Sequence, residues 1–199
     1  MFSIHTKTRP RFLFLSRELT YALGALVLRA KYYAKLYIKD IIYGANDGII
    51  STFAVVASIE GAQLSSFAIL IVGFASLCAD GASMATSSYL AYKSDKEVRS
   101  LDNYDESGAK PFLEALVTFF SFITAGSVPL IPYILLGHEN PKIYMISALS
   151  AITTLFLIGG LRTRITQKNF IVAGLEMGLL GSLAGAIAYT VGLFVASLR

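Results

Sequence analysis

Two carboxylates lie inside otherwise apolar stretches of the sequence. Asp47 is the only charged residue of Ile41–Ile59, and Asp80 is the only charged residue of Gly61–Tyr92. A charged side chain at the centre of a membrane span costs about 2.5–3.5 kcal/mol on insertion scales, and such residues mark ion or proton pathways by default. Asp47 follows Asp40 by roughly 10 Å along a helix, which is too deep for its short side chain to reach the membrane surface.

Each carboxylate belongs to a stripe of polar residues with helical spacing. The first stripe comprises Tyr43, Asn46, Asp47 and Ser51, and the second comprises Ser76, Asp80, Met84 and Ser87 or Ser88. Residues three or four apart share one face of a helix. Carboxylate oxygens supply charge for a divalent cation, and a thioether favours borderline ions such as Fe²⁺ over Mg²⁺ or Ca²⁺. The stripes predict Asp47, Asp80 and Met84 as metal ligands. Asn46 would be a neutral oxygen ligand or a hydrogen-bonding neighbour, and the same carboxylates could exchange protons.

A structural interpretation of these residues stays open. Protonated carboxylates and serines can hold helices together by hydrogen bonds, and Met84 can fill a core. Gly44 and Gly48 bracket Asp47, and Gly181 and Gly185 repeat their spacing. Small residues at this spacing allow two helices to approach closely.

Further polar residues extend the candidate pathway. We expect it to include Ser76, Tyr43 and Ser51. Glu176 and Glu114, near the cytosolic ends of their predicted spans, are either pathway entrances or solvated helix ends. The acids of Ser94–Lys110 could collect cations, but neighbouring basic residues offset them, which favours a solvated loop. Cys78, the single cysteine, is expected to be a small buried packing residue.

The composition is that of a membrane protein. Hydrophobic residues make up 55% of the 199-residue chain, and the mean hydropathy is +0.62. Five segments approach the roughly 20 apolar residues that a helix needs to cross a bilayer. They lie at about 38–59, 66–92, 112–136, 143–161 and 170–197. The sequence predicts an all-α membrane protein with five transmembrane helices in 38–199. Pro111 opens the third span, and Pro129 and Pro132 should kink or end it.

The placement of lysine and arginine predicts the orientation. Of these 17 residues, only Lys142 and Arg199 fall on the side opposite the N-terminal segment. Because cytosolic loops carry the excess of positive charge, the N-terminus is predicted to be cytosolic and the C-terminus external or lumenal. The net charge of +4 therefore reflects topology, and we expect no nucleic-acid partner. Residues 1–37 form a basic cytosolic segment, predicted to contain an amphipathic helix on the membrane surface.

The sequence offers little support for catalysis. His138-Glu139-Asn140-Pro141 is not the H-E-x-x-H zinc motif, and neither a G-x-S-x-G elbow nor a phosphate-binding Walker loop occurs. Both histidines lie outside the predicted spans. We therefore expect neither an enzyme nor a permanently bound cofactor.

The residues of the polar stripes resemble the motifs of the vacuolar iron transporter family. The matching segments are Gly44-Ala45-Asn46-Asp47-Gly48-Ile49-Ile50-Ser51, Ala79-Asp80-Gly81-Ala82-Ser83-Met84 and Tyr89-Leu90-Ala91-Tyr92-Lys93-Ser94, with weaker matches in Pro129-Leu130-Ile131-Pro132 and Gly174-Leu175-Glu176-Met177. The resemblance implies a five-span homodimer whose ion path runs along the dimer interface between the first and second spans. It implies export of cytosolic Fe²⁺, often also Mn²⁺, in exchange for protons. Asp47 matches the family's span-one aspartate, and Met84 its span-two methionine.

The sequence departs from the family pattern at two places. Ser76 occupies a position where the family commonly has an acid, and Asp80, one turn nearer to Met84, is a candidate substitute. Ser94–Lys110 is too short for the long cytosolic metal-binding domain of the best-known members.

The leading hypothesis is a proton-coupled transporter that moves Fe²⁺ or Mn²⁺ out of the cytosol as a homodimer. It would be a multi-pass protein of the cell (inner) membrane or a vacuolar-type membrane. The alternative is a non-transporting membrane protein whose polar residues hold helices together, within a larger assembly. A transporter of small organic solutes is a third possibility, for which Tyr43 and Tyr89 offer thin support.

Overall fold

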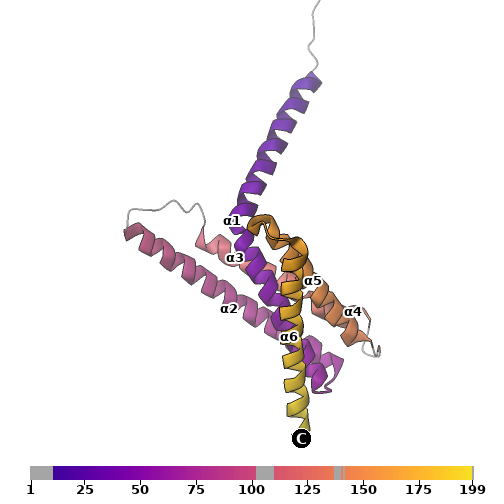
Figure 1. Cartoon of the computed structure of the whole chain (residues 1–199). Coiled ribbons are helices and arrows are strands. Elements are labelled where there is room, and N and C mark those ends of the chain that lie inside the picture. The colour runs from indigo at the N-terminus through magenta and orange to yellow at the C-terminus, as the bar shows by residue number, and fades with distance from the viewer. Residues whose placement is uncertain (1–10, 102–109, 137–139, 141, 199) are drawn as a thin grey trace, which may run out of the picture. The chain divides into compact units, whose positions relative to one another are not determined.

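The computed structural model describes residues 11–101, 110–136, 140 and 142–198, and within them it contains helices and no strands. The elements are α1 (Arg11–Gly61), α2 (Ser66–Leu101), α3 (Pro111–Gly126), the 3-10 helix η1 (Val128–Leu130), α4 (Ile131–Leu135), α5 (Ile143–Thr166) and α6 (Phe170–Ser197) (Figure 1). Five stretches are long and apolar enough to cross a membrane: Leu36–Gly61, Ser66–Ser100, Pro111–Leu135, Ile143–Thr163 and Phe170–Ser197. They confirm the prediction of an all-α, multi-pass membrane protein with five spans.

The chain divides into two compact units, Met1–Ile38 and Lys39–Arg199. In the first unit, residues 11–38 belong to helix α1. The cytosolic location of this segment, its place on the membrane surface and the orientation of the termini stay predictions. The hydrophobic core and the cavity described below lie in the second unit.

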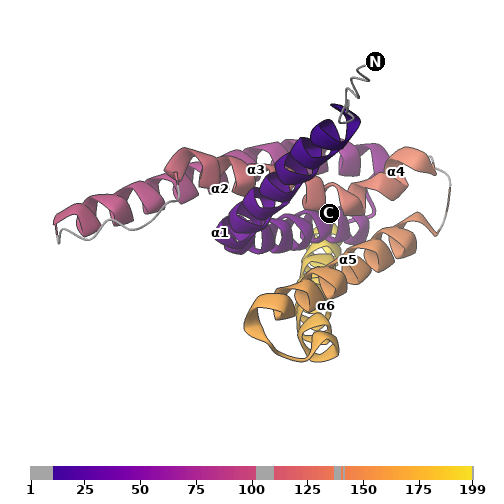
Figure 2. The ribbon, with the colours of Figure 1, turned by 90° about the horizontal axis from the view of Figure 1, so that it is seen from above.

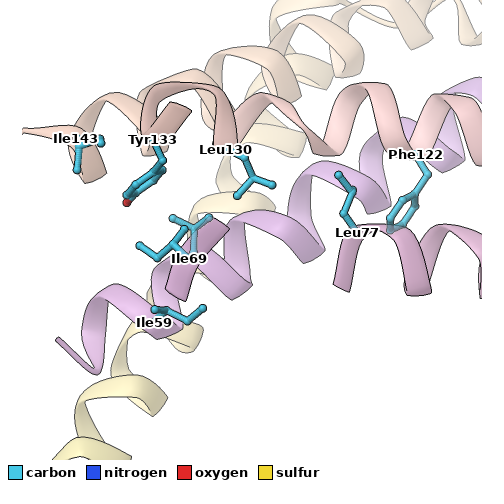
Figure 3. Close-up of a cluster of buried hydrophobic side chains, with 8 residues drawn as sticks. Ile59, Ile69, Leu77, Phe122, Leu130, Tyr133 and Ile143 are labelled. Atoms are coloured by element: carbon cyan, nitrogen blue, oxygen red, sulfur yellow. The ribbon is translucent and has the colours of Figure 1, made fainter. Parts of the chain in front are cut away.

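Within the second unit, helix α2 packs on α3, and α5 packs on α6 (Figures 1 and 2). A cluster of buried apolar side chains joins the first three spans to η1, α4 and the start of α5; its members are Val56, Ile59, Ile69, Leu77, Phe122, Leu130, Tyr133 and Ile143 (Figure 3). A second cluster of Ile49, Phe53, Ala151 and Leu155 packs α1 on α5. Asp47 of the polar stripe is not a member of either cluster and is exposed.

The glycines around Asp47 bring α1 against α3. A methyl group added at Gly44 would lie 2.7 Å from the backbone oxygen of Thr118, and one added at Gly48 would overlap the backbone oxygen of Phe122. The prediction that this glycine pair allows close helix contact is confirmed. Because the two backbones nearly touch, the side chains that flank the glycines on α1 are held at a fixed position relative to α3.

The prolines of the third span act as predicted. Pro111 occupies the first turn of α3. The span then passes through η1, which contains Pro129, and continues as α4, which contains Pro132. Ser147 of α5 donates a hydrogen bond of 2.6 Å to the backbone oxygen of Pro129, an oxygen in the irregular part of the span. This buried bond ties the irregular part to α5.

Two expectations are wrong. The predicted loop at 94–110 is helical as far as Leu101, because α2 continues past the apolar segment with Arg99 and Asp95 3.0 Å apart, one helical turn from each other. Residues 102–109, with the remaining acids of that segment, lie outside the described residues. Cys78 is exposed, whereas its neighbour Leu77 is buried, because only one face of α2 packs against the rest of the chain.

Candidate functional site

The polar faces of α1, α2 and α3 meet around a cavity of about 720 Å³. It is lined by Lys39, Asp40, Tyr43, Asp47, Met84, Ser87, Ser88, Ala91, Tyr92, Asp95, Arg99 and Thr118. The lining residues extend over about two turns of α1, from Lys39 to Asp47, and about four turns of α2, from Met84 to Arg99. The cavity is therefore elongated along these two helices.

Three of the predicted site residues line this cavity. Asp47 and Tyr43 reach it from α1, and Met84 reaches it from α2. Asp47 and Tyr43 are exposed, and Met84 is half-buried and also packs against the apolar cluster of Figure 3. A carboxylate and a thioether thus face one space from two different spans.

Asp80 does not belong to the set that lines the cavity. It is exposed on α2, and the hydroxyl of Ser76 donates a hydrogen bond of 2.7 Å to its Oδ2 atom. Asp47 and Asp80 are nevertheless close enough for their negative charges to interact. Within one chain, Ser76 and Asp80 form a pair beside the cavity, and Asp80 is not a wall residue of it.

Asn46 and Ser51 also lie outside the lining set. The Oδ1 atom of Asn46 is buried and has no hydrogen-bond partner among the described residues. Ser51 donates a hydrogen bond of 2.7 Å to the backbone oxygen of Asp47, one turn earlier on α1. Its hydroxyl proton is therefore committed to its own helix.

Glu114 and Glu176, each predicted to be either a pathway entrance or a solvated helix end, differ in burial and in position. Glu114, in the first turn of α3, is only 2% exposed and so is not a solvated helix end. Its carboxylate interacts electrostatically with Asp40, a cavity residue. Glu176 is exposed on α6, and its neighbour Met177 is buried against Gly159 of α5. Glu176 is thus not brought together with the cavity residues.

The sequence analysis missed Asp40 and Tyr92 as site residues. Asp40 is 5% exposed, and the Tyr92 hydroxyl donates a hydrogen bond of 2.9 Å to its Oδ1 atom. The Lys39 ammonium lies 5.9 Å from the centre of the Tyr92 ring. A signal was present in the sequence, because Asp40 is two turns before Asp47 on the same face of α1.

The remaining contacts close the cavity wall. The hydroxyls of Ser88 and Thr118 lie 3.4 Å apart and link α2 to α3. Arg99 and Asp95, both half-exposed, form an ion pair at the end of the cavity that lies farthest along α2.

Among the described residues, no group of three or more His, Cys, Asp and Glu side chains has the arrangement of a complete metal site. Of the four predicted metal ligands, Asp47 and Met84 are the two that line the cavity.

Comparison with known proteins identifies relatives of the chain. The family model described as VIT family matches residues 38–107 and 97–193. The two matches overlap at residues 97–107, and together they cover the cavity residues and most of each of the five spans.

Several curated proteins are similar to the chain over most of their length. The vacuolar iron transporter of Plasmodium berghei (strain Anka) is 25% identical over 81% of this chain and 83% of its own. Vacuolar iron transporter 1 of Tulipa gesneriana is 26% identical over 80% of this chain and 87% of its own. The vacuolar iron transporter of Toxoplasma gondii is 24% identical over 78% and 73%, respectively.

Proposed function

The chain belongs to the VIT family, and from this membership we propose that it is a membrane transporter of divalent metal ions, with Fe²⁺ or Mn²⁺ as cargo. One observation carries the proposal: Asp47 and Met84, from separate spans, line a single cavity. The curated relatives bear the name vacuolar iron transporter, which describes transport and not catalysis. Their name fits a site that combines a carboxylate with a thioether, because this ligand set suits Fe²⁺ better than Mg²⁺ or Ca²⁺.

Within this function, Asp47 binds the ion and Met84 supplies the preference for borderline metals. Asp80, on the adjacent helix, adds a second carboxylate, and its electrostatic interaction with Asp47 supports this role. Asn46 contributes a neutral oxygen close to Asp47. Carboxylates that release a metal ion can take up protons in its place, so exchange of metal for H⁺ is the coupling that these residues support.

A homodimer would complete the site. Asp47 and Asp80 are exposed on spans of the single chain. Carboxylates at this depth face a protein interior or a water-filled space and not lipid. A second chain that covers the exposed faces of α1 and α2 would enclose both carboxylates and double the number of ligands. The proposed ion path therefore runs along the contact between two copies.

The proposed direction of transport is out of the cytosol, into the external or lumenal space. It rests on the placement of lysine and arginine, which predicts that the N-terminus, the end of α2 and the start of α3 share the cytosolic side. The host membrane is then the cell (inner) membrane or a vacuolar-type membrane.

Uptake by proteoliposomes tests the proposal. Fe²⁺ entry should increase when a pH gradient is imposed and should fall to background in Asp47→Ala. Glu97→Gln, which removes an exposed acid on α2 outside the cavity, is the matched control and should transport normally. Wild-type rates in a well-folded Asp47→Ala variant would refute the site, and absence of Fe²⁺ and Mn²⁺ uptake by the folded wild type would refute the function.

The structural alternative makes opposite predictions. If Asp47 and Asp80 only hold helices together, then Asp47→Asn and Asp80→Asn should lower thermal stability while Fe²⁺ and Mn²⁺ leave the stability unchanged. A transporter predicts instead that either metal raises the melting temperature, because a ligand that binds only the folded state stabilises it.

A further inference from the structure

Two carboxylates are buried in the second unit away from Asp47. Asp40, on α1, is 5% exposed, and Glu114, on α3, is 2% exposed. The Oδ2 atom of Asp40 and the Oε2 atom of Glu114 are both buried without a hydrogen-bond partner among the described residues. A buried carboxylate oxygen that is neither paired nor hydrogen-bonded is costly. Two such oxygens on facing helices therefore require an explanation.

The contact between α1 and α3 brings the two carboxylates to the same level. A methyl group added at Gly44 would lie 2.7 Å from the backbone oxygen of Thr118, and Asp40 and Glu114 each lie one turn before these contacting residues. Their charges interact, and the Tyr92 hydroxyl of α2 donates a hydrogen bond to the other oxygen of Asp40. The positive charge of Lys39 acts on both carboxylates, but its side chain is exposed. Three helices thus contribute to this cluster. It contains two carboxylates, but only one nearby ammonium group and one hydroxyl that donates a hydrogen bond.

The pair is connected to the cavity. Asp40 and Tyr92 line it directly, and Glu114 lies one helical turn before the lining residue Thr118. Asp40 is about 10 Å along α1 from Asp47. The pair is therefore separate from the Asp47–Met84 site, and Asp40 connects it to the same cavity.

We propose that Asp40 and Glu114 form a second, oxygen-only site for a divalent cation, which loads ions from the predicted cytosolic end of the cavity. This proposal rests on the proposed transport function and adds a step to it. The carboxylates supply two negative charges and the unpartnered oxygens, and no sulfur atom is among the groups described at this site. Oxygen ligands alone suit harder divalent cations such as Mn²⁺, which keep part of their water shell, whereas the preference for Fe²⁺ is supplied later in the path by the thioether of Met84.

Lys39 acts as the counter-charge of the site when no metal is bound. Its ammonium group partly neutralises the two carboxylates, and an arriving cation must displace that interaction. Lys39→Gln should therefore raise the affinity of this site for Mn²⁺. If Lys39 served only to stabilise a structural ion cluster, its removal would lower the melting temperature and leave Mn²⁺ affinity unchanged.

Electron paramagnetic resonance of Mn²⁺ tests the proposal on the purified full chain. The variant Asp47→Asn/Met84→Leu removes the proposed main site, and it should still bind one Mn²⁺ per chain. Adding Asp40→Asn or Glu114→Gln should abolish this binding. Adding Glu97→Gln, which removes an exposed acid of α2 outside the cavity, should preserve it. Equal binding in all four variants, or equal loss from the Glu97→Gln control, would overturn the proposal.

A milder substitution guards against misfolding. Tyr92→Phe keeps both carboxylates and removes only the hydroxyl that fixes Asp40 in place. It should weaken Mn²⁺ binding in the same background without abolishing it, and an unchanged affinity would count against the site.

Transport is measured separately from binding. A chain that transports Fe²⁺ but has no Mn²⁺ site at Asp40 refutes this inference alone. A chain that binds Mn²⁺ there and transports nothing refutes the proposed function alone.

Discussion

At the scale of residues, the contrast between Asp47 and Met84 determines what the cavity can do. Asp47 supplies charge and is exposed, whereas Met84 is half-buried and packs on the apolar cluster of Figure 3. Met84 therefore has two possible roles, as a ligand and as a packing residue. The ligand role needs the sulfur atom, whereas the packing role needs only the volume of the side chain, which leucine nearly matches.

Met84→Leu separates these roles. The substitution nearly conserves volume, so we expect the free energy of unfolding to change by less than about 1.5 kcal/mol. If the sulfur binds the ion, the preference for Fe²⁺ over Mn²⁺ should fall in uptake assays that contain both metals. An unchanged Fe²⁺ to Mn²⁺ ratio, at unchanged total uptake, would assign Met84 to packing alone.

At the scale of elements, the contact between α1 and α3 positions the site. Gly44 and Gly48 lie against the backbone of α3, and Asp47 lies between them on the adjacent face of α1. Phe122 is both the residue whose backbone Gly48 touches and a member of the main apolar cluster. A shift of α1 away from α3 would therefore displace Asp47 and open the core at the same time.

Gly48→Ala should produce that shift. The added methyl group would overlap the backbone oxygen of Phe122, and overpacking of this kind costs about 1–3 kcal/mol. Thermal unfolding in detergent should show a lower melting temperature, with reduced Fe²⁺ uptake. Gly178→Ala on α6 is the matched control: its methyl group would lie 3.8 Å from Ile152, an ordinary contact, so stability should be unchanged or slightly higher. Equal stability of the two variants would contradict the role assigned to the α1–α3 contact.

At the scale of the whole molecule, the described part of the chain leaves a polar surface that one copy does not cover. Asp47, Asp80 and Cys78 are all exposed within segments that are apolar enough to cross a membrane. Lipid is a poor environment for the two carboxylates. A second copy is the simplest cover, since it would present the same residues in return.

The purified protein should therefore have twice the 21.5 kDa mass of one chain when light scattering is corrected for bound detergent. Replacing Ala79, an exposed small residue beside Asp80, by tryptophan should shift the protein towards the monomer and abolish Fe²⁺ uptake. Ala186→Trp, at an exposed position on α6, is the control and should leave the dimer intact. A wild-type monomer that transports Fe²⁺ would exclude the dimer as a requirement.

The sequence by itself determined the five spans, the bend at the prolines and the close approach at Gly44 and Gly48. These features follow from local causes: the length of an apolar run, the missing amide hydrogen of proline and the missing side chain of glycine. The sequence also marked Asp47 as a site residue, because a carboxylate stands out in an apolar background. Periodicity placed Met84 on the polar face of its own helix.

Only the tertiary structure decided which polar residues share a space. Helical spacing shows which side chains lie on one face of one helix, but not which faces of different helices meet. For this reason Asp40 was overlooked: it stands at the end of an apolar run, where sequence alone cannot separate a solvated carboxylate from a buried one. Packing of α1, α2 and α3 buries Asp40 together with Glu114 and places Tyr92 against it. The same packing leaves Asp80 and Cys78 exposed on α2, because that helix buries Ile69 and Leu77 in the main apolar cluster instead.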